Sequence, residues 1–187
     1  MKIFIDGSAG TTGLRIKDRL MKRSDVELTT LSEEQRKDTE SRKQALNSAQ
    51  VAFLCLPDAA AVEAVELVEN PDTVIIDTST AHRTSEGWAY GFPELSAEFE
   101  DKIKNSKRIA VPGCHAGGFI ALVYPLVEAG VLGNDALLNC YSLTGYSGGG
   151  KKMIAEYESE NKSPLLFAPR QYGLTQQHKH LKEMKGI

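Results

Sequence analysis

The sequence lacks the long apolar runs, basic tracts and dense cysteines that are typical of membrane, nucleic-acid-binding and disulfide-rich proteins. No apolar run approaches the roughly 20 residues that a bilayer-spanning helix needs. Lys and Arg number 22 against 25 Asp and Glu, so the net charge is −3 and no basic stripe for nucleic acid is present. Cys55, Cys114 and Cys140 are odd in number and widely separated. We therefore expect free thiols in a reducing compartment.

The first residues contain no basic region followed by an apolar core, so we expect no signal peptide and a cytoplasmic location. The length of 187 residues suits one large domain or two small ones. An apolar content of 41% and a charged content of 25% are ordinary for a globular protein.

A glycine-rich turn follows the first predicted strand, Lys2–Ile5, and precedes a helical pattern over Leu14–Arg23. Strand, turn and helix form the context of a dinucleotide-binding fingerprint, although the spacing here is G-x-x-G-x-x-G. Such a turn would hold a pyrophosphate at the helix N-terminus; a purely structural turn is the alternative. The predicted cofactor-binding residues of the turn are Gly7, Ser8, Gly10, Thr11, Thr12 and Gly13.

The end of the second predicted strand, Val26–Leu31, is where such folds select between NAD and NADP. Ser32, with Arg36 close behind, favours NADP because an arginine there accommodates the 2′-phosphate. Glu33 and Glu34 leave NAD as an alternative cofactor, and Ser32–Lys43 could also be a solvated polar helix.

Strands and helices then alternate, which predicts βαβ units and an α/β fold with a Rossmann-type parallel sheet. Val51–Leu56 and Thr73–Ile76 are buried strands, joined by a helix with Val62, Val65 and Val68 aligned that runs to Asn70. Ligands of such sheets bind outside the carboxyl ends of the strands. The residues expected on this rim, beside the glycine turn, are Pro57, Asp58, Ser79–Arg83 and Cys114.

Arg83 is a candidate anchor for a carboxylate or phosphate, because its guanidinium can bind either in a bidentate manner. A surface loop residue is the alternative.

Cys114 follows the short apolar run Ile109–Val111 and the Pro112-Gly113 turn. Phe119, Leu122, Val123 and Leu126 recur at the spacing of one buried helix face, so Cys114 is predicted at a helix N-terminus. Unpaired N–H groups and the helix dipole there lower a thiol pKa and could hold an oxyanion. The alternative is an inert, buried cysteine.

Two later segments carry further candidates. Leu137–Leu143 is predicted to be a strand that leads into Thr144–Lys152, where Ser147, Gly148 and Gly149 could form an anion-binding loop or a flexible linker.

In Tyr172–Met184, Thr175 could cap a short helix, with Glu183 near the face of His180 and within reach of His178. A histidine with a nearby carboxylate is a plausible general base. No C-x-x-C or H-E-x-x-H spacing is present, so no metal site is predicted.

Taken together, these motifs resemble the short form of the N-acetyl-γ-glutamyl-phosphate reductase family, which is similar to aspartate-semialdehyde dehydrogenase. The segments that carry the resemblance are Gly7–Gly13, Asp77–Arg83, Tyr90–Leu95, Val111–His115, Gly145–Gly150 and His178–Glu183.

The resemblance implies a Rossmann domain over 1–113 and an α+β catalytic and oligomerisation domain from 114. Family members continue well beyond the histidine segment, so we expect 114–187 to be only the N-terminal part of that second domain. Homo-oligomers, a dimer or tetramer, are expected of the full-length form.

The resemblance also implies an NADPH-dependent, aldehyde-forming oxidoreductase of arginine biosynthesis that acts on an acyl phosphate through a cysteine thioester. Cys114 would be the nucleophile and His178 the acid/base, supported by Tyr172 and Glu183; Arg83, Ser147, Gly148 and Gly149 are candidates for substrate binding. An aspartyl-phosphate reductase, a non-catalytic dinucleotide-binding module and a Cys–His hydrolase remain alternatives.

Overall fold

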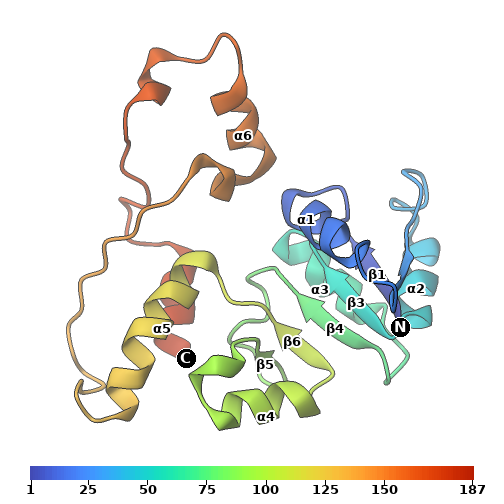
Figure 1. Cartoon of the computed structure of the whole chain (residues 1–187), viewed down its shortest axis with the longest axis horizontal. Helices are drawn as coiled ribbons and strands as arrows, with labels where there is room; N and C mark the ends of the chain where they lie inside the picture. The colour runs from blue at the N-terminus through green and yellow to red at the C-terminus, as the bar shows by residue number, and fades with distance from the viewer.

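A computed structural model describes residues 1–187 and contains one six-stranded sheet with helices on both sides (Figure 1). All neighbouring strands are parallel, in the order β2-β1-β3-β4-β6-β5. This confirms the predicted α/β fold with a Rossmann-type parallel sheet. The strands are β1 (Lys2–Asp6), β2 (Glu27–Thr29), β3 (Val51–Leu54), β4 (Val74–Asp77), β5 (Ala89–Tyr90) and β6 (Arg108–Ala110).

Seven α-helices and three short 3₁₀ helices connect and follow the strands. None of the helices has the length and apolar character needed to cross a membrane. The α-helices are α1 (Thr11–Leu20), α2 (Thr39–Ser48), α3 (Asp58–Glu66), α4 (Ala97–Asn105), α5 (Cys114–Glu128), α6 (Gly150–Glu158) and α7 (Lys179–Gly186). The 3₁₀ helices are η1 (Pro93–Leu95), η2 (Tyr146–Gly149) and η3 (Pro164–Phe167).

The central strands are apolar along most of their length because helices cover both faces of a parallel sheet. Phe4, Leu54 and Ile75 are almost completely buried, and they form the main core with Ala45 and Leu46 of α2. A second, smaller apolar cluster surrounds α5 and contains Tyr90, Ala116 and Ile120, with Met184 of α7 packed against it.

The sheet has its topological switch point between β1 and β3. The chain moves from β1 to β2 on one side of β1 and then returns to β3 on the other side. The loops after β1 and β3 therefore diverge from the same edge of the sheet and leave a crevice, which is where open α/β sheets bind their ligands.

The strand predicted over Leu137–Leu143 is absent, which corrects the sequence-based prediction. The segment has no regular secondary structure, and Leu137 is 100% exposed and Leu143 83% exposed. A strand is stable only when its N–H and C=O groups pair with a neighbouring strand, and no strand of this chain lies beside the segment.

Two helix predictions also need correction. The buried face of α5 contains Ala116 and Ile120, whereas Leu122 is 74% exposed, although it was predicted to lie on the buried face. Helix α3 ends at Glu66 instead of Asn70 and buries Ala61 and Ala64, which leaves Val62 exposed. In both helices the small residues face the neighbouring elements because they allow a close approach of the backbones.

Candidate active site

The glycine turn after β1 is shaped by contact with the backbone that leaves β3. Gly7 has a φ of +82°, and a Cβ atom on it would lie 2.2 Å from the carbonyl oxygen of Cys55. A Cβ atom on Gly13 would lie 2.4 Å from the carbonyl oxygen of Gly7. Both positions therefore require glycine, for conformation at Gly7 and for space at both. The turn is packed as tightly as a dinucleotide fingerprint requires.

Asp6, the last residue of β1, fixes the start of this turn through a partly buried ion pair. Its Oδ2 accepts hydrogen bonds from Nε (3.0 Å) and Nη2 (2.8 Å) of Arg42 on α2. The pair ties the strand end to a helix on which no functional residue was predicted. Sequence spacing gives no signal for it, because 36 residues separate the partners.

Three helices that begin at this rim have no side-chain cap. Gly10 before α1, Pro57 before α3 and Gly113 before α5 provide no capping hydrogen bond, whereas α2 is capped by Asp38. The first-turn N–H groups of an uncapped helix can bind an anionic ligand. Thr11 and Thr12 lie in the first turn of α1, and Ser8 lies in the loop before it.

Ser32 and Arg36 lie together just beyond β2. The backbone N–H of Arg36 donates to the Ser32 carbonyl at 3.0 Å, and Ser32 Oγ accepts from the N–H of Gln35 at 3.2 Å. The segment forms a turn before α2 begins at Thr39, so the alternative of a polar helix over Ser32–Lys43 holds only for its second half.

Cys114 is the first residue of α5 and its side chain is exposed. A cavity of about 400 Å³ opens beside it and is lined by His115, Gly118, Phe119 and the segment 138–142. A larger groove of about 690 Å³ between α5 and α7 does not include Cys114. The smaller cavity is therefore the candidate space for a group that reacts with the thiol.

Three histidine rings gather beside the start of α5. The ring of His178 lies 6.1 Å from that of His115 and 4.5 Å from that of His180, measured between centroids. The Tyr172 hydroxyl lies 3.1 Å from Nε2 of His178, as expected of a supporting residue, and Nδ1 of His178 accepts from the His180 N–H at 3.2 Å. Burial and the neighbouring His115 and Lys179 lower the pKa of His178, which favours the neutral imidazole.

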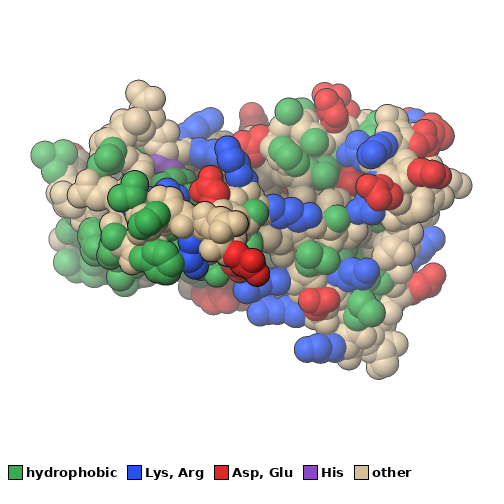
Figure 2. All heavy atoms as spheres, turned by 90° about the horizontal axis from the view of Figure 1, so that it is seen from above, with side chains coloured by type: hydrophobic (Ala, Val, Ile, Leu, Met, Phe, Trp, Pro, Cys, Tyr) green, Lys and Arg blue, Asp and Glu red, His purple; other side chains and the backbone are tan.

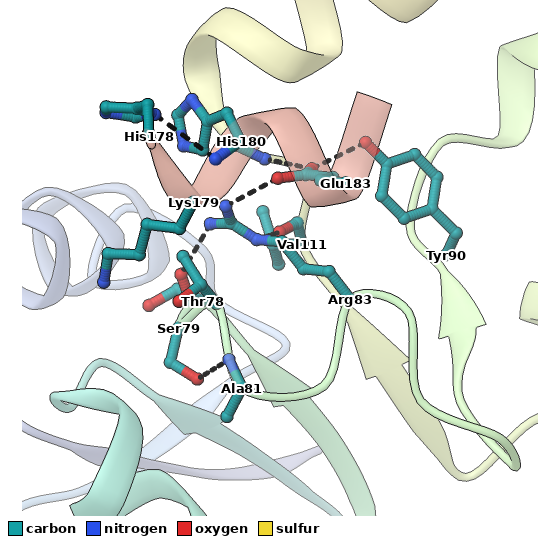
Figure 3. A network of polar contacts seen from close by, with 12 residues as sticks. Thr78, Ser79, Ala81, Arg83, Tyr90, Val111, His178, Lys179, His180 and Glu183 are labelled. Carbon is teal, nitrogen blue, oxygen red and sulfur yellow. Dashed lines mark hydrogen bonds and ion pairs between the residues drawn. The ribbon is translucent and has the colours of Figure 1, made fainter. Parts of the chain in front are cut away.

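The helix that carries His180 and Glu183 begins later than predicted. It starts at Lys179 with His178 as its cap, and Thr175 has no capping role. Glu183 turns away from His178. Its carboxylate accepts hydrogen bonds from Tyr90 and Arg83 (Figure 3) and from the backbone N–H of Gly113.

Arg83 is buried and its guanidinium is occupied within the chain. Nε donates to the Val111 carbonyl at 2.9 Å, Nη2 to the Thr78 carbonyl at 3.2 Å and Nη1 to Glu183 at 2.8 Å. These contacts brace the ends of β4 and β6 against α7. The predicted part of Arg83 in substrate binding stays a prediction.

Ser147, Gly148 and Gly149 lie in the exposed η2 just before α6. Figure 1 shows α6 in a lobe joined to the rest of the chain by two extended connections. No hydrogen bond joins these three residues to Cys114, and their predicted part in substrate binding stays a prediction.

Asp58 and Ser79–Arg83 were expected on this rim, but sequence reasoning gave no indication of the partners that hold them there. Asp58 accepts from the backbone N–H of Thr80 and from Nζ of Lys179 at 3.1 Å, and so ties α3 to the start of α7. The buried Asp77 lies 2.7 Å from Nδ1 of His82. Apart from Asp77 and His82 these partners are far apart in the sequence, so no local motif marks them. No group of three or more His, Cys, Asp or Glu side chains is arranged to bind a metal.

Protonation of the buried His180 should destabilise the folded chain in mild acid. It is 8% exposed, its Nδ1 has no hydrogen-bond partner, and burial lowers its pKa from 6.5 to about 4. The unfolded chain therefore binds more protons between these values, so stability falls as the pH drops from about 6.5 towards 4. We expect His180 to contribute a loss of about 2–3 kcal/mol between pH 7 and 4.5, measured by urea unfolding.

The control for this experiment is His180→Phe, which keeps an aromatic ring but cannot titrate. The difference between the unfolding free energies of the wild-type chain and the variant at each pH separates the contribution of His180 from that of the carboxylates, which titrate in the same range. An identical pH dependence in the two proteins would contradict the prediction.

Comparisons with known proteins agree with this arrangement. The family described as semialdehyde dehydrogenase, NAD binding domain, matches residues 2–105, and the semialdehyde dehydrogenase dimerisation domain matches residues 114–186. In solved structures, aspartate semialdehyde dehydrogenase from Francisella tularensis superposes with a TM-score of 0.62 at 16% identity, covering 89% of this chain and 53% of that one. The Vibrio cholerae enzyme II gives 0.59 at 15% identity, covering 91% and 54%.

Curated relatives are much more similar in sequence. A protein of Chelativorans sp. named N-acetyl-gamma-glutamyl-phosphate reductase is 52% identical over 98% of this chain, and one of Mesorhizobium japonicum with the same name is 48% identical over 99%. A Pseudomonas putida protein named N-acetyl-gamma-glutamyl-phosphate reductase 2 is 49% identical over 98%. The chain spans 58–59% of the length of these relatives.

Proposed function

This chain belongs to the semialdehyde dehydrogenase family, and from that membership we propose that it carries the cofactor site and the nucleophile of an N-acetyl-γ-glutamyl-phosphate reductase. The reaction is the NADPH-dependent reduction of N-acetyl-γ-glutamyl phosphate to N-acetylglutamate 5-semialdehyde and phosphate. The observation that carries the proposal is the position of Cys114, at the first residue of α5 on the same sheet edge as the glycine turn. This reaction would make the protein that contains the chain an oxidoreductase of arginine biosynthesis.

The residues at the switch point fit a dinucleotide. The turn is packed so closely that side chains at Gly7 and Gly13 would overlap backbone atoms, and the first turn of α1 has no side-chain acceptor. We assign the pyrophosphate to the turn from Gly7 to Gly13, with Pro57 at the facing loop. When bound, the nicotinamide supplies the hydride that reduces the acyl group.

The acyl group is transferred first to Cys114. Its thiolate attacks the γ-carbonyl carbon, the C–S bond forms, and the C–O bond to phosphate breaks as phosphate leaves with the bonding electrons. The uncapped N–H groups of the first turn of α5 are placed to hold the negative charge that develops on the carbonyl oxygen. The thioester thus divides one difficult step into two.

His178 serves proton transfer in the second half of the reaction. After hydride addition to the thioester, the C–S bond breaks, the aldehyde leaves and the Cys114 thiolate is restored. A neutral His178, favoured by its lowered pKa, takes a proton as a general base, and the imidazolium so formed returns one to the sulfur or oxygen. Tyr172, at 3.1 Å, orients the ring.

The half-reaction at Cys114 tests the proposal. Incubation of the chain with N-acetyl-γ-glutamyl phosphate and no dinucleotide should add one N-acetylglutamyl group, found by mass spectrometry on the peptide that contains Cys114. Addition of NADPH should then remove it as the semialdehyde. Modification by aspartyl phosphate instead would support an aspartate-semialdehyde dehydrogenase, and no modification by either would leave a dinucleotide-binding module.

The preference for NADP depends on the residues beyond β2. We propose that Arg36, beside Ser32, pairs with the 2′-phosphate, so Arg36→Ala should weaken NADPH binding by about 10- to 100-fold. NADH binding should change little. Fluorescence titration with both nucleotides measures this, and Lys37→Ala is the matched control, since it removes a neighbouring exposed charge. Equal losses for NADPH and NADH in Arg36→Ala would contradict the assignment.

The match to a dimerisation domain supports a homo-oligomer, which we propose for the protein that contains this chain. Its other partner is the small acyl-phosphate substrate. A cytoplasmic location, the domain division at residue 113 and the part of Ser147, Gly148 and Gly149 in binding the substrate remain predictions.

A further inference from the structure

Glu183 carries the densest set of long-range polar contacts at the rim. It is 3% exposed, and its Oε1 accepts from the Gly113 N–H at 2.7 Å and from the Tyr90 hydroxyl at 2.8 Å. Its Oε2 accepts from Nη1 of Arg83 at 2.8 Å. These partners lie 70, 93 and 100 residues away in the sequence. A single side chain of α7 therefore holds three separate parts of the chain (Figure 3).

The buried carboxylate of Glu183 is neutralised by the guanidinium of Arg83. The Arg83 side chain is 8% exposed and that of Glu183 3%, so the ion pair is shielded from water. Burial and the neighbouring Glu183 raise the pKa of Tyr90, so its hydroxyl keeps its proton and donates it to the carboxylate. A buried charge with this many partners is held in one position, and removal of a partner leaves the others unsatisfied.

His178 is not among these partners. Both of its ring nitrogens contact other groups, with Nε2 3.1 Å from the Tyr172 hydroxyl and Nδ1 accepting from the His180 N–H. Glu183 therefore has no contact through which it would orient that imidazole.

Gly113 is the residue immediately before Cys114 and occupies the N-cap position of α5. A Cβ atom on it would lie 2.4 Å from Nε2 of His180 and 2.5 Å from Nη1 of Arg83. Helix α7 thus packs directly on the backbone of the turn, and the only group that Gly113 offers on this side is its N–H. The hydrogen bond from that N–H to a charged acceptor fixes the direction in which the turn enters α5.

We propose that Glu183 is a positioning residue for the Cys114 turn, acting through the Gly113 N–H and braced by Arg83 and Tyr90, and that it does not act on His178. The importance of this role for catalysis rests on the function proposed above. The geometric statement itself does not, because it concerns only contacts within the chain.

The test compares Glu183→Gln with Tyr172→Phe in the full 187-residue chain, without substrate or dinucleotide. In Glu183→Gln, the Gly113 amide proton should move upfield in the ¹H–¹⁵N spectrum, because its acceptor loses its charge. Alkylation of Cys114 by iodoacetamide should slow by roughly tenfold, which corresponds to one charge-assisted hydrogen bond. The ring resonances of His178 should stay in place. Tyr172→Phe should give the opposite pattern, with His178 shifted and Gly113 unchanged.

A Glu183→Gln variant that shifts His178 and leaves Gly113 in place would overturn the proposal and assign Glu183 to the histidine. If that variant does not fold, Tyr90→Phe removes one donor and keeps the Arg83–Glu183 pair. It should move the Gly113 amide in the opposite sense, downfield, because Oε1 keeps its charge and accepts one hydrogen bond fewer. An unmoved amide would overturn the proposal. Lys182→Gln, an exposed change on the same helix, is the matched control and should alter neither signal. Because neither readout uses acyl phosphate, failure here is distinguishable from failure of the proposed reaction.

Discussion

Replacement of Cys114 by serine should lower the rate of acyl transfer from N-acetyl-γ-glutamyl phosphate by at least about a thousandfold, because a hydroxyl at this position is a far weaker nucleophile than a thiolate. NADPH binding should stay within about twofold, since the predicted dinucleotide site lies at the switch point and removal of one sulfur touches none of its contacts. Mass spectrometry of the acylated chain and fluorescence titration with NADPH measure the two effects.

Cys140→Ser is the matched control for this experiment. Cys140 is exposed and lines the same cavity, so it meets the same reagents as Cys114. The Cys140 variant should acylate at the wild-type rate. Acylation that persists in Cys114→Ser, or that disappears in Cys140→Ser, would contradict the assignment of the nucleophile.

Replacement of Gly7 by alanine should damage both the fold and the cofactor site. The new Cβ would lie 2.2 Å from the Cys55 carbonyl oxygen, and the φ of +82° is unfavourable for any residue with a side chain. Overpacking against a backbone atom and the strained φ together should cost about 2–5 kcal/mol of unfolding free energy. The displaced turn should also bind NADPH at least about tenfold more weakly.

Gly87→Ala separates the effect of the strained φ from the effect of the clash with a backbone atom. Gly87 has nearly the same φ, +79°, but nothing lies within 4 Å of the position of its Cβ. The Gly87→Ala variant should lose only about 1 kcal/mol of unfolding free energy and bind NADPH as the wild-type chain does. If Gly7→Ala behaved like Gly87→Ala in both measurements, close packing of the turn on the β3 loop would not determine its role.

The local parts of the molecule were predictable from the sequence. The parallel sheet follows from apolar strands that alternate with helices, and the glycine turn follows from its place between the first strand and the first helix. The position of Cys114 at the start of α5 was also predicted and is confirmed. These features depend on residues within about ten positions of one another, and over such distances periodicity and turn chemistry decide the structure.

Other predictions failed where a neighbour distant in the sequence decides. The spacing of Leu122 and Leu126 predicted a buried face of α5, but both are exposed and the helix packs through Ala116 and Ile120. Helical periodicity predicts that one face is apolar. It does not predict which side the next elements cover, and a strongly apolar helix such as α5 has more than one candidate face.

The sequence by itself therefore determined the fold class, the glycine turn and the position of Cys114 on the sheet edge. The tertiary structure alone decided that Glu183 contacts Gly113, that Arg83 is buried beneath α7 and that 137–143 has no strand partner. The physical reason is the distance in sequence between the residues that stabilise each feature. Helices and turns are stabilised mainly by contacts between residues close in sequence, whereas a buried carboxylate or a strand is stable only where distant segments supply its hydrogen bonds.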